Sequence, residues 1–185
     1  MSHLGLHTFA LPLPLLQSPA LSVLLPVVCG GVIGYTTNRL RSTKAVYGAL
    51  RQPPLRPPAW LFGPVWTVLY AGMGYAAHRV SLASSSSASP SALGLYSLQL
   101  GLNFAWMPLF FGARRAKAAM LDIAVLSGVA AWCAKEFAEV DALAGRLMVP
   151  YLAWLGFATY ITAGVGRLNG WDIQGVVDRE LGKTE

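Results

Sequence analysis

Five apolar segments, each close to the length of a membrane-spanning helix, constrain the fold of this chain more than any other feature. They are residues 20–38, 59–77, 92–111, 118–134 and 147–166. The hydrocarbon core of a bilayer is about 30 Å thick, which a helix crosses in about 20 residues. Lipid offers no hydrogen-bond partner to the backbone, so such segments must be helical. The sequence therefore predicts an all-α integral membrane protein, a bundle of five transmembrane helices.

The composition supports a chain for which lipid is part of the solvent. Hydrophobic residues make up 55% and charged residues 12% of the 185 residues, whereas soluble domains carry about 25% charge. We expect one membrane domain, residues 20–166, preceded by an N-terminal tail, residues 1–19. The polar residues 167–185 are expected to form a loosely packed C-terminal tail. The first span is expected to serve as the targeting element, because the N-terminus resembles neither a signal peptide nor a transit peptide.

The basic residues predict how the bundle is oriented. With five spans, 11 of the 14 lysines and arginines lie on the same side as the C-terminus and 3 lie on the other. Basic residues favour the cytoplasmic side, so the C-terminus is predicted to be cytosolic and the N-terminus to face away. Basic loops beside anionic headgroups also account for the net charge of +6. We therefore expect the lipid bilayer, and no nucleic acid, as a partner.

A search for catalytic groups gives no strong candidate. The sequence has no paired carboxylates, no nucleophile with a nearby base, no phosphate-binding loop and no metal cluster. Asp122 is the one acid within a span, and a structural pair with Arg114, Arg115 or Lys117 is favoured over a proton relay. His78, at the end of the second span, is a weak candidate for a haem ligand, and an interfacial histidine is the commoner case. No obligatory cofactor or metal is expected.

Aromatic residues instead line up on one face of several predicted helices. The helical period brings together Gln99, Asn103, Trp106 and Phe110 on the third span, and Tyr151, Trp154, Ala158 and Ile161 on the fifth. On the second span, Trp66 and Tyr70 align below Pro64. Flat side chains beside small or amide ones describe a slot for a flat or rigid apolar molecule, with Asn103 as its polar handle. Core packing between helices explains the same pattern equally well.

Small residues on the first span predict a close helix contact. Gly30 and Gly34 form a small-xxx-small pair that allows two helices to approach. Packing within one chain is favoured over contact with a second copy.

Three motifs in order carry a resemblance to a known family. They are PPAWLFGPVWTVLYAGMGY (57–75), LYSLQLGLNFAWMPLFFGAR (95–114) and PYLAWLGFATY (150–160). Together they resemble the translocator protein (TspO/MBR) family, the tryptophan-rich sensory or peripheral-type benzodiazepine receptor proteins. The resemblance implies a five-helix membrane bundle, often a homodimer, that binds porphyrins and, in animals, cholesterol. It also implies the mitochondrial outer membrane, or alternatively ER and secretory membranes, if the chain is eukaryotic.

The resemblance also implies a binding site. Its ligand-binding residues match Phe62, Val65, Trp66, Asn103, Trp106, Trp154, Ala158 and Ile161, to which we add Trp60 and Tyr70. Trp60 is also placed as an interfacial anchor would be. The basic first loop matches the loop that covers the pocket in the family, with Arg39, Arg41 and Arg51 as candidate entrance residues.

Two positions depart from the family pattern. Ala118 stands where animal members carry a further pocket tryptophan. Ala163 stands at the tyrosine position of the cholesterol motif, and the nearby Tyr160 is too far from Arg167 to replace it. We therefore do not expect high-affinity cholesterol binding.

The resemblance implies a membrane receptor or carrier for tetrapyrroles, such as protoporphyrin IX or haem, with a role in porphyrin homeostasis or stress response. The porphyrin is expected as a ligand and not as a cofactor. One alternative is a light- and oxygen-dependent enzyme that degrades porphyrin, with Trp66 and Trp154 as reactive partners. Another is a sterol-binding transport component. The sequence leaves these alternatives open.

Overall fold

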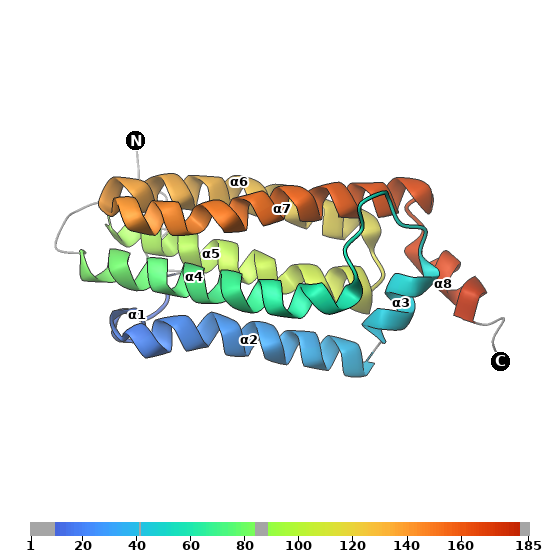
Figure 1. Ribbon diagram of the computed structural model, residues 1–185, viewed down its shortest axis with the longest axis horizontal. Helices are drawn as coiled ribbons and strands as arrows, with labels where there is room; N and C mark the ends of the chain where they lie inside the picture. Colours follow the sequence, from blue (N-terminus) through green and yellow to red (C-terminus); the bar gives the residue numbers. More distant parts are fainter. Residues whose placement is uncertain (1–9, 41, 84–88, 182–185) are drawn as a thin grey trace.

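The computed structural model describes residues 10–40, 42–83 and 89–181, and this part of the chain is helical, with no strand. Five long helices lie side by side along the longest axis of the molecule (Figure 1). They are α2 (Pro19–Leu40), α4 (Phe62–Leu82), α5 (Ser89–Met107), α6 (Ala116–Val140) and α7 (Ala142–Leu168). Three short helices accompany them: α1 (Leu13–Gln17), α3 (Thr43–Ala49) and α8 (Ile173–Leu181). The prediction of an all-α fold is confirmed.

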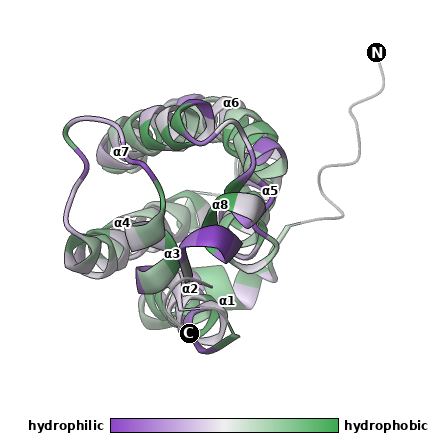
Figure 2. Cartoon of the chain, turned by 90° about the vertical axis from the view of Figure 1, so that its right-hand side faces the viewer, coloured by the Kyte–Doolittle hydropathy of each residue, from purple (hydrophilic) through white to green (hydrophobic). Residues whose placement is uncertain are grey.

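Three of the long helices are long and apolar enough to cross a bilayer, namely α2, α6 and α7. This confirms a membrane protein, while the number of spans stays a prediction. Helices α3 and α8 lie together at one end of the bundle, and the turn between α6 and α7 lies at the other (Figure 1). Seen from the α3 end, hydrophilic segments gather on the short helices and the nearby loop (Figure 2).

Prolines set where two of the long helices start or end. Pro58 is extended and precedes a 3-10 turn, Ala59–Leu61, that leads directly into α4. Pro64 lies in the first turn of α4, where its missing N–H removes no helical hydrogen bond. Pro108 follows α5 and begins a π-helical turn, Pro108–Gly112, in which the Ala113 N–H donates to the Pro108 carbonyl at 2.8 Å. The proline-rich entrance to α4 thus fixes the direction in which this helix enters the bundle.

Glycines allow α2 to lie directly against α4. A Cβ added at Gly30 would lie 2.3 Å from Cε2 of Tyr70, and one added at Gly74 would lie 2.2 Å from the Ser22 carbonyl oxygen. The Ser22 hydroxyl donates to the Gly74 carbonyl at 2.6 Å. The close contact of Gly30 is therefore made within one chain, as favoured from the sequence.

The expectation of a loosely packed C-terminal tail is wrong for α8. Ile173 and Val177 are fully buried, and they belong to an apolar cluster that includes Val46 and Leu50 from α3 and the adjoining loop. These two residues are four apart, so one face of the short helix is apolar although its overall composition is polar. The N-terminal segment 1–19 also holds a packed element, because Leu16 of α1 is buried against the main core.

The expected pairing of Asp122 is also wrong. Arg114 pairs with Asp178 of α8, not with Asp122. Arg114 has a positive φ of 54° in the turn before α6, and this turn directs its side chain towards α8. Among the residues that the structure describes, Oδ2 of Asp122 is buried without a hydrogen-bond partner.

Candidate functional site

A cavity of about 760 Å³ opens into the bundle near the α3 end. Residues of α2, α3, α4, α5 and α7 line it, together with the π-helical turn and the loop that precedes α4. Small-molecule sites have volumes of roughly 300–1,000 Å³ and mostly apolar walls. The cavity is therefore large enough for a drug-sized or cofactor-sized ligand.

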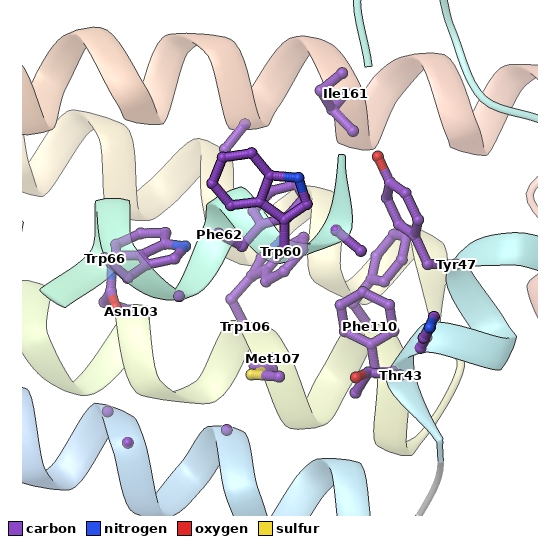
Figure 3. A pocket seen from close by; sticks show the side chains of 18 of the residues that line it. Thr43, Tyr47, Trp60, Phe62, Trp66, Asn103, Trp106, Met107, Phe110 and Ile161 are labelled. Carbon is purple, nitrogen blue, oxygen red and sulfur yellow. The ribbon is translucent and has the colours of Figure 1, made fainter. Parts of the chain in front are cut away.

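Aromatic rings form most of the wall in the middle of this cavity (Figure 3). Trp106 stacks on Phe110 with ring centroids 5.0 Å apart and an interplanar angle of 15°, and its edge meets Phe111 at 6.1 Å. On α4, Trp66 and Tyr70 lie 5.3 Å apart. Rings fixed against one another in this way offer flat apolar surfaces without needing to be ordered by the ligand.

Most of the predicted ligand-binding residues line this one cavity. They are Trp60, Phe62, Trp66, Tyr70, Asn103, Trp106, Ala158 and Ile161.

Val65 and Trp154 were predicted with the others but do not line the cavity. Val65 packs partly buried against the main core. The Trp154 ring meets the edge of Phe62 at 6.0 Å, so it supports a lining residue from the side of α7. The helical period correctly places Trp154 and Ala158 on the same face of α7. The ring of Phe62 from α4 packs against Trp154, however, and it is Phe62 that lines the cavity.

A chain of buried hydrogen bonds closes the inner end of the cavity. The Tyr70 hydroxyl donates to Oδ1 of Asn103 at 2.6 Å, and Nδ2 of Asn103 donates to the Tyr151 hydroxyl at 3.1 Å. The Tyr151 hydroxyl in turn donates to Oε1 of Gln99 at 2.7 Å. The predicted polar handle, Asn103, is thus also a structural link between α4, α5 and α7. Sequence reasoning named the two amides and both tyrosines but missed the hydrogen bonds that join them.

The loop between α3 and α4, the covering loop expected from the family resemblance, contributes Gln52 to the cavity lining and is fastened by hydrogen bonds. The side chain of Asn169 holds the backbone of Arg51 on both sides: its Oδ1 accepts from the Arg51 N–H at 3.1 Å, and its Nδ2 donates to the Arg51 carbonyl at 2.9 Å. The Tyr160 hydroxyl donates to the Pro54 carbonyl at 2.9 Å. From α3, the Tyr47 hydroxyl donates to the Pro57 carbonyl of the loop at 2.9 Å. The fastenings by Asn169 and Tyr160 come from α7 and the residue that follows it, and the one by Tyr47 comes from α3.

The predicted entrance arginines do not line the cavity. Arg39 lies with its guanidinium carbon 5.9 Å above the ring of Tyr35, which is itself a lining residue. Arg51 is exposed on the covering loop. Arg41 lies outside the described residues. The basic residue that does line the cavity is Lys44 of α3, which sequence reasoning counted only as part of the basic loop.

Two polar atoms in the lining side chains are buried without a hydrogen-bond partner among the described residues. They are Nε1 of Trp106, a donor, and Oε1 of Gln52, an acceptor. Such atoms are costly to leave unpaired, and a ligand with complementary groups is one way to satisfy them.

His78, the weak candidate for a metal ligand, lies away from the cavity. Its Nδ1 is 2.9 Å from the Leu16 carbonyl oxygen, which can only accept, so Nδ1 carries the proton. His78 thereby ties α1 to α4. Across the described ranges, no group of three or more histidine, cysteine or acidic side chains is arranged to hold a metal ion.

Comparison with known proteins gives a consistent result. The sequence profile of the TspO/MBR family matches residues 22–168. The chain is 43% identical to a translocator protein homolog of Schizosaccharomyces pombe over 149 residues, which cover 79% of this chain and 88% of that protein. It is 44% identical to the human translocator protein over 128 residues, 68% and 76% of the two chains. Against the tryptophan-rich protein TspO of Chlorobaculum tepidum, identity is 38% over 125 residues, 66% and 78% of the two chains.

Proposed function

The chain belongs to the TspO/MBR family, and from this premise we propose that it is a membrane receptor or carrier for tetrapyrroles. Protoporphyrin IX or haem would bind as a ligand in the aromatic cavity, and the protein would serve porphyrin homeostasis or a stress response. The observation that carries the proposal is the cavity of about 760 Å³ with Trp60, Trp66 and Trp106 in its wall.

The chemistry of the wall suits a flat, rigid ligand. A tetrapyrrole presents a wide aromatic face, which gains dispersion and stacking energy from the fixed rings of Trp106 and Phe110. Nε1 of Trp106 supplies an unused donor, and Asn103 and Tyr70 give the inner end some polarity. The propionates of the ligand would point to the outer end, where Arg39 and Arg51 attract anions before they enter, and from the sequence we expect the same of Arg41.

A binding titration tests this proposal. The purified full-length protein in nanodiscs is titrated with protoporphyrin IX, haem and cholesterol, and binding is followed by tryptophan fluorescence and porphyrin absorbance. Trp106→Ala removes a wall residue and should weaken porphyrin binding about fivefold or more, because a buried aromatic contact is worth about 1–3 kcal/mol. Trp154→Ala, which alters a ring behind the wall, should have a smaller effect. Equal affinity of the unaltered protein and Trp106→Ala for every ligand would contradict the site.

The alternative function is light- and oxygen-dependent degradation of the bound porphyrin. The position of Trp66 on the cavity wall favours this candidate, because a light-excited porphyrin can oxidise an adjacent indole. Illuminating the porphyrin complex in air separates the two functions. Loss of the porphyrin absorption band that requires Trp66 favours the enzyme, and an unchanged band with quenched fluorescence favours the receptor. In the same experiment, Trp154 should be needed less than Trp66.

The remaining expectations are part of the same proposal. We propose a multi-pass protein with a cytosolic C-terminus, a homodimer, and the mitochondrial outer membrane as its location if the chain is eukaryotic. ER or secretory membranes are the alternative location. A sterol-binding transport role is the less favoured alternative function, because the cholesterol-motif tyrosine is replaced at Ala163.

A further inference from the structure

The cavity is chemically different at its two ends. Trp66 and Asn103 lie at the inner end, and Thr43 and Tyr47 of α3 lie at the outer end, with Trp60 and Trp106 between them (Figure 3). Lys44 follows Thr43 and also lines the outer end. Among the described residues that line the cavity, Lys44 is the one that carries a charge.

The ammonium group of Lys44 is available to a ligand. In the described ranges the salt bridges join Arg79 to Asp141, Arg114 to Asp178 and Lys135 to Glu139, so none of them uses Lys44. No carboxylate lines the cavity in this part of the chain. A lysine can lay its methylene stem along apolar surface while its charged end stays in water. At the mouth of an aromatic cavity, this geometry provides one positive charge beside a large apolar surface.

From these observations we propose that Lys44 selects ligands that carry an acidic group and fixes their orientation. The rigid apolar body lies among the aromatic rings, and a carboxylate pairs with the Lys44 ammonium at the outer end. A neutral ligand of the same shape gains the apolar contacts but not the ion pair. The pocket therefore binds the acidic ligand more tightly, by the free energy that the ion pair contributes. This inference rests on the proposed function, and it assigns to Lys44 a part that differs from that of the entrance arginines. Charges outside the cavity raise the association rate, whereas a paired charge within it slows dissociation.

The test compares protoporphyrin IX with its dimethyl ester, which has the same ring but no carboxylate. Both are titrated against the full-length protein in nanodiscs of zwitterionic phosphatidylcholine, so that no anionic lipid competes. The variants are Lys44→Gln, Lys44→Arg and Lys117→Gln, the last being an exposed lysine in the first turn of α6 that does not line the cavity. Circular dichroism and size-exclusion chromatography confirm that each variant is folded.

We expect the unaltered protein to bind the diacid more tightly than the diester. Lys44→Gln should weaken diacid binding roughly two- to fivefold, mainly through faster dissociation, and leave diester binding unchanged, since an exposed ion pair contributes about that factor. Lys44→Arg should retain the preference, and Lys117→Gln should behave like the unaltered protein. If the diester binds and diacid affinity is indifferent to Lys44→Gln, or both affinities fall equally, the inference is wrong while the proposed function stands. If neither porphyrin binds the unaltered protein, the proposed function fails and the inference fails with it.

Discussion

At the scale of single residues, Asn103 has two roles, one in the cavity wall and one in the packing of the helices. Its side chain lines the cavity, and both ends of its amide are bonded to tyrosines of neighbouring helices. A buried phenol that loses its partner is penalised by its desolvation. A polar group in the wall of the proposed binding site is therefore also one that holds α4, α5 and α7 together.

Asn103→Ala should lower the free energy of unfolding by about 1–2 kcal/mol, because it leaves the hydroxyls of Tyr70 and Tyr151 short of a partner. The change is measured by SDS titration in mixed micelles. Asn38→Ala, which removes exposed hydrogen bonds to Thr43, serves as the control and should cost less than about 0.5 kcal/mol. Equal losses in the two variants would show that the buried chain of hydrogen bonds adds no stability of its own.

At the scale of elements, the turn between α6 and α7 is joined to the end of α4. Asp141 caps α7 by accepting from the N–H groups of Leu143 and Ala144 at 2.9 and 2.8 Å. It also accepts from Arg79, with Nη2 of Arg79 2.7 Å from Oδ2 of Asp141. The hydrogen bond from Arg79, with help from the backbone N–H groups, lowers the pKa of Asp141 to about 2 from its usual 3.8.

This shift predicts how stability depends on pH. A carboxyl group with a lowered pKa in the folded state stabilises the fold fully above its unfolded pKa, so the contribution is complete above about pH 4 and is lost as pH falls towards 2. Asp141→Asn should abolish this part of the acid dependence. The measurement is the unfolding temperature of both proteins between pH 2 and 6. A parallel decline in the two proteins would mean that Asp141 does not titrate in this way.

The covering loop depends on a second junction, at the end of α7. Asn169→Ala removes both hydrogen bonds to the Arg51 backbone, and the loop is then fastened to α7 by the Tyr160 bond to Pro54. We expect amide hydrogen exchange in residues 50–58 to accelerate and the porphyrin dissociation rate to rise. Both are measured on the full-length protein in nanodiscs.

Tyr160→Phe is the companion variant, and it should produce the same effects more weakly because it removes one hydrogen bond. Unchanged exchange in Asn169→Ala would show that the hydrogen bonds of Asn169 do not limit the opening of the loop.

At the scale of the whole molecule, the distribution of basic residues leads to a test of orientation. Eleven of the 14 lysines and arginines fall on the side of α3 and the C-terminus if the five long helices all span the bilayer. An epitope tag added after Glu185 should then be accessible to protease in cells whose plasma membrane is permeabilised and whose organelle membranes stay closed. Protection of the tag until the organelle membrane is dissolved would reverse the predicted orientation, and a four-span arrangement would also change which loops are cleaved.

The sequence predicted the main helices and most of the cavity because both follow from local patterns. Long apolar runs indicate the helices, and a period of three to four residues places Trp106 and Phe110 on one face. The positions that were missed depend on contacts between distant elements. Trp154 lies beside Phe62 of α4, Arg114 turns towards Asp178 of α8, and Lys44 is brought to the cavity by the fold of the loop. No helical period contains that information.

The π-helical turn after α5 has a consequence for how the aromatic wall tolerates changes in chain length. Successive side chains of an α-helix point about 100° apart, yet Phe110 and Phe111 both reach the cavity, because this turn accommodates one residue more than an α-helical turn would. Deleting a single residue between positions 108 and 112 would favour regular winding and rotate one ring outwards. An alteration that leaves the overall hydrophobicity almost untouched would thereby reshape the pocket.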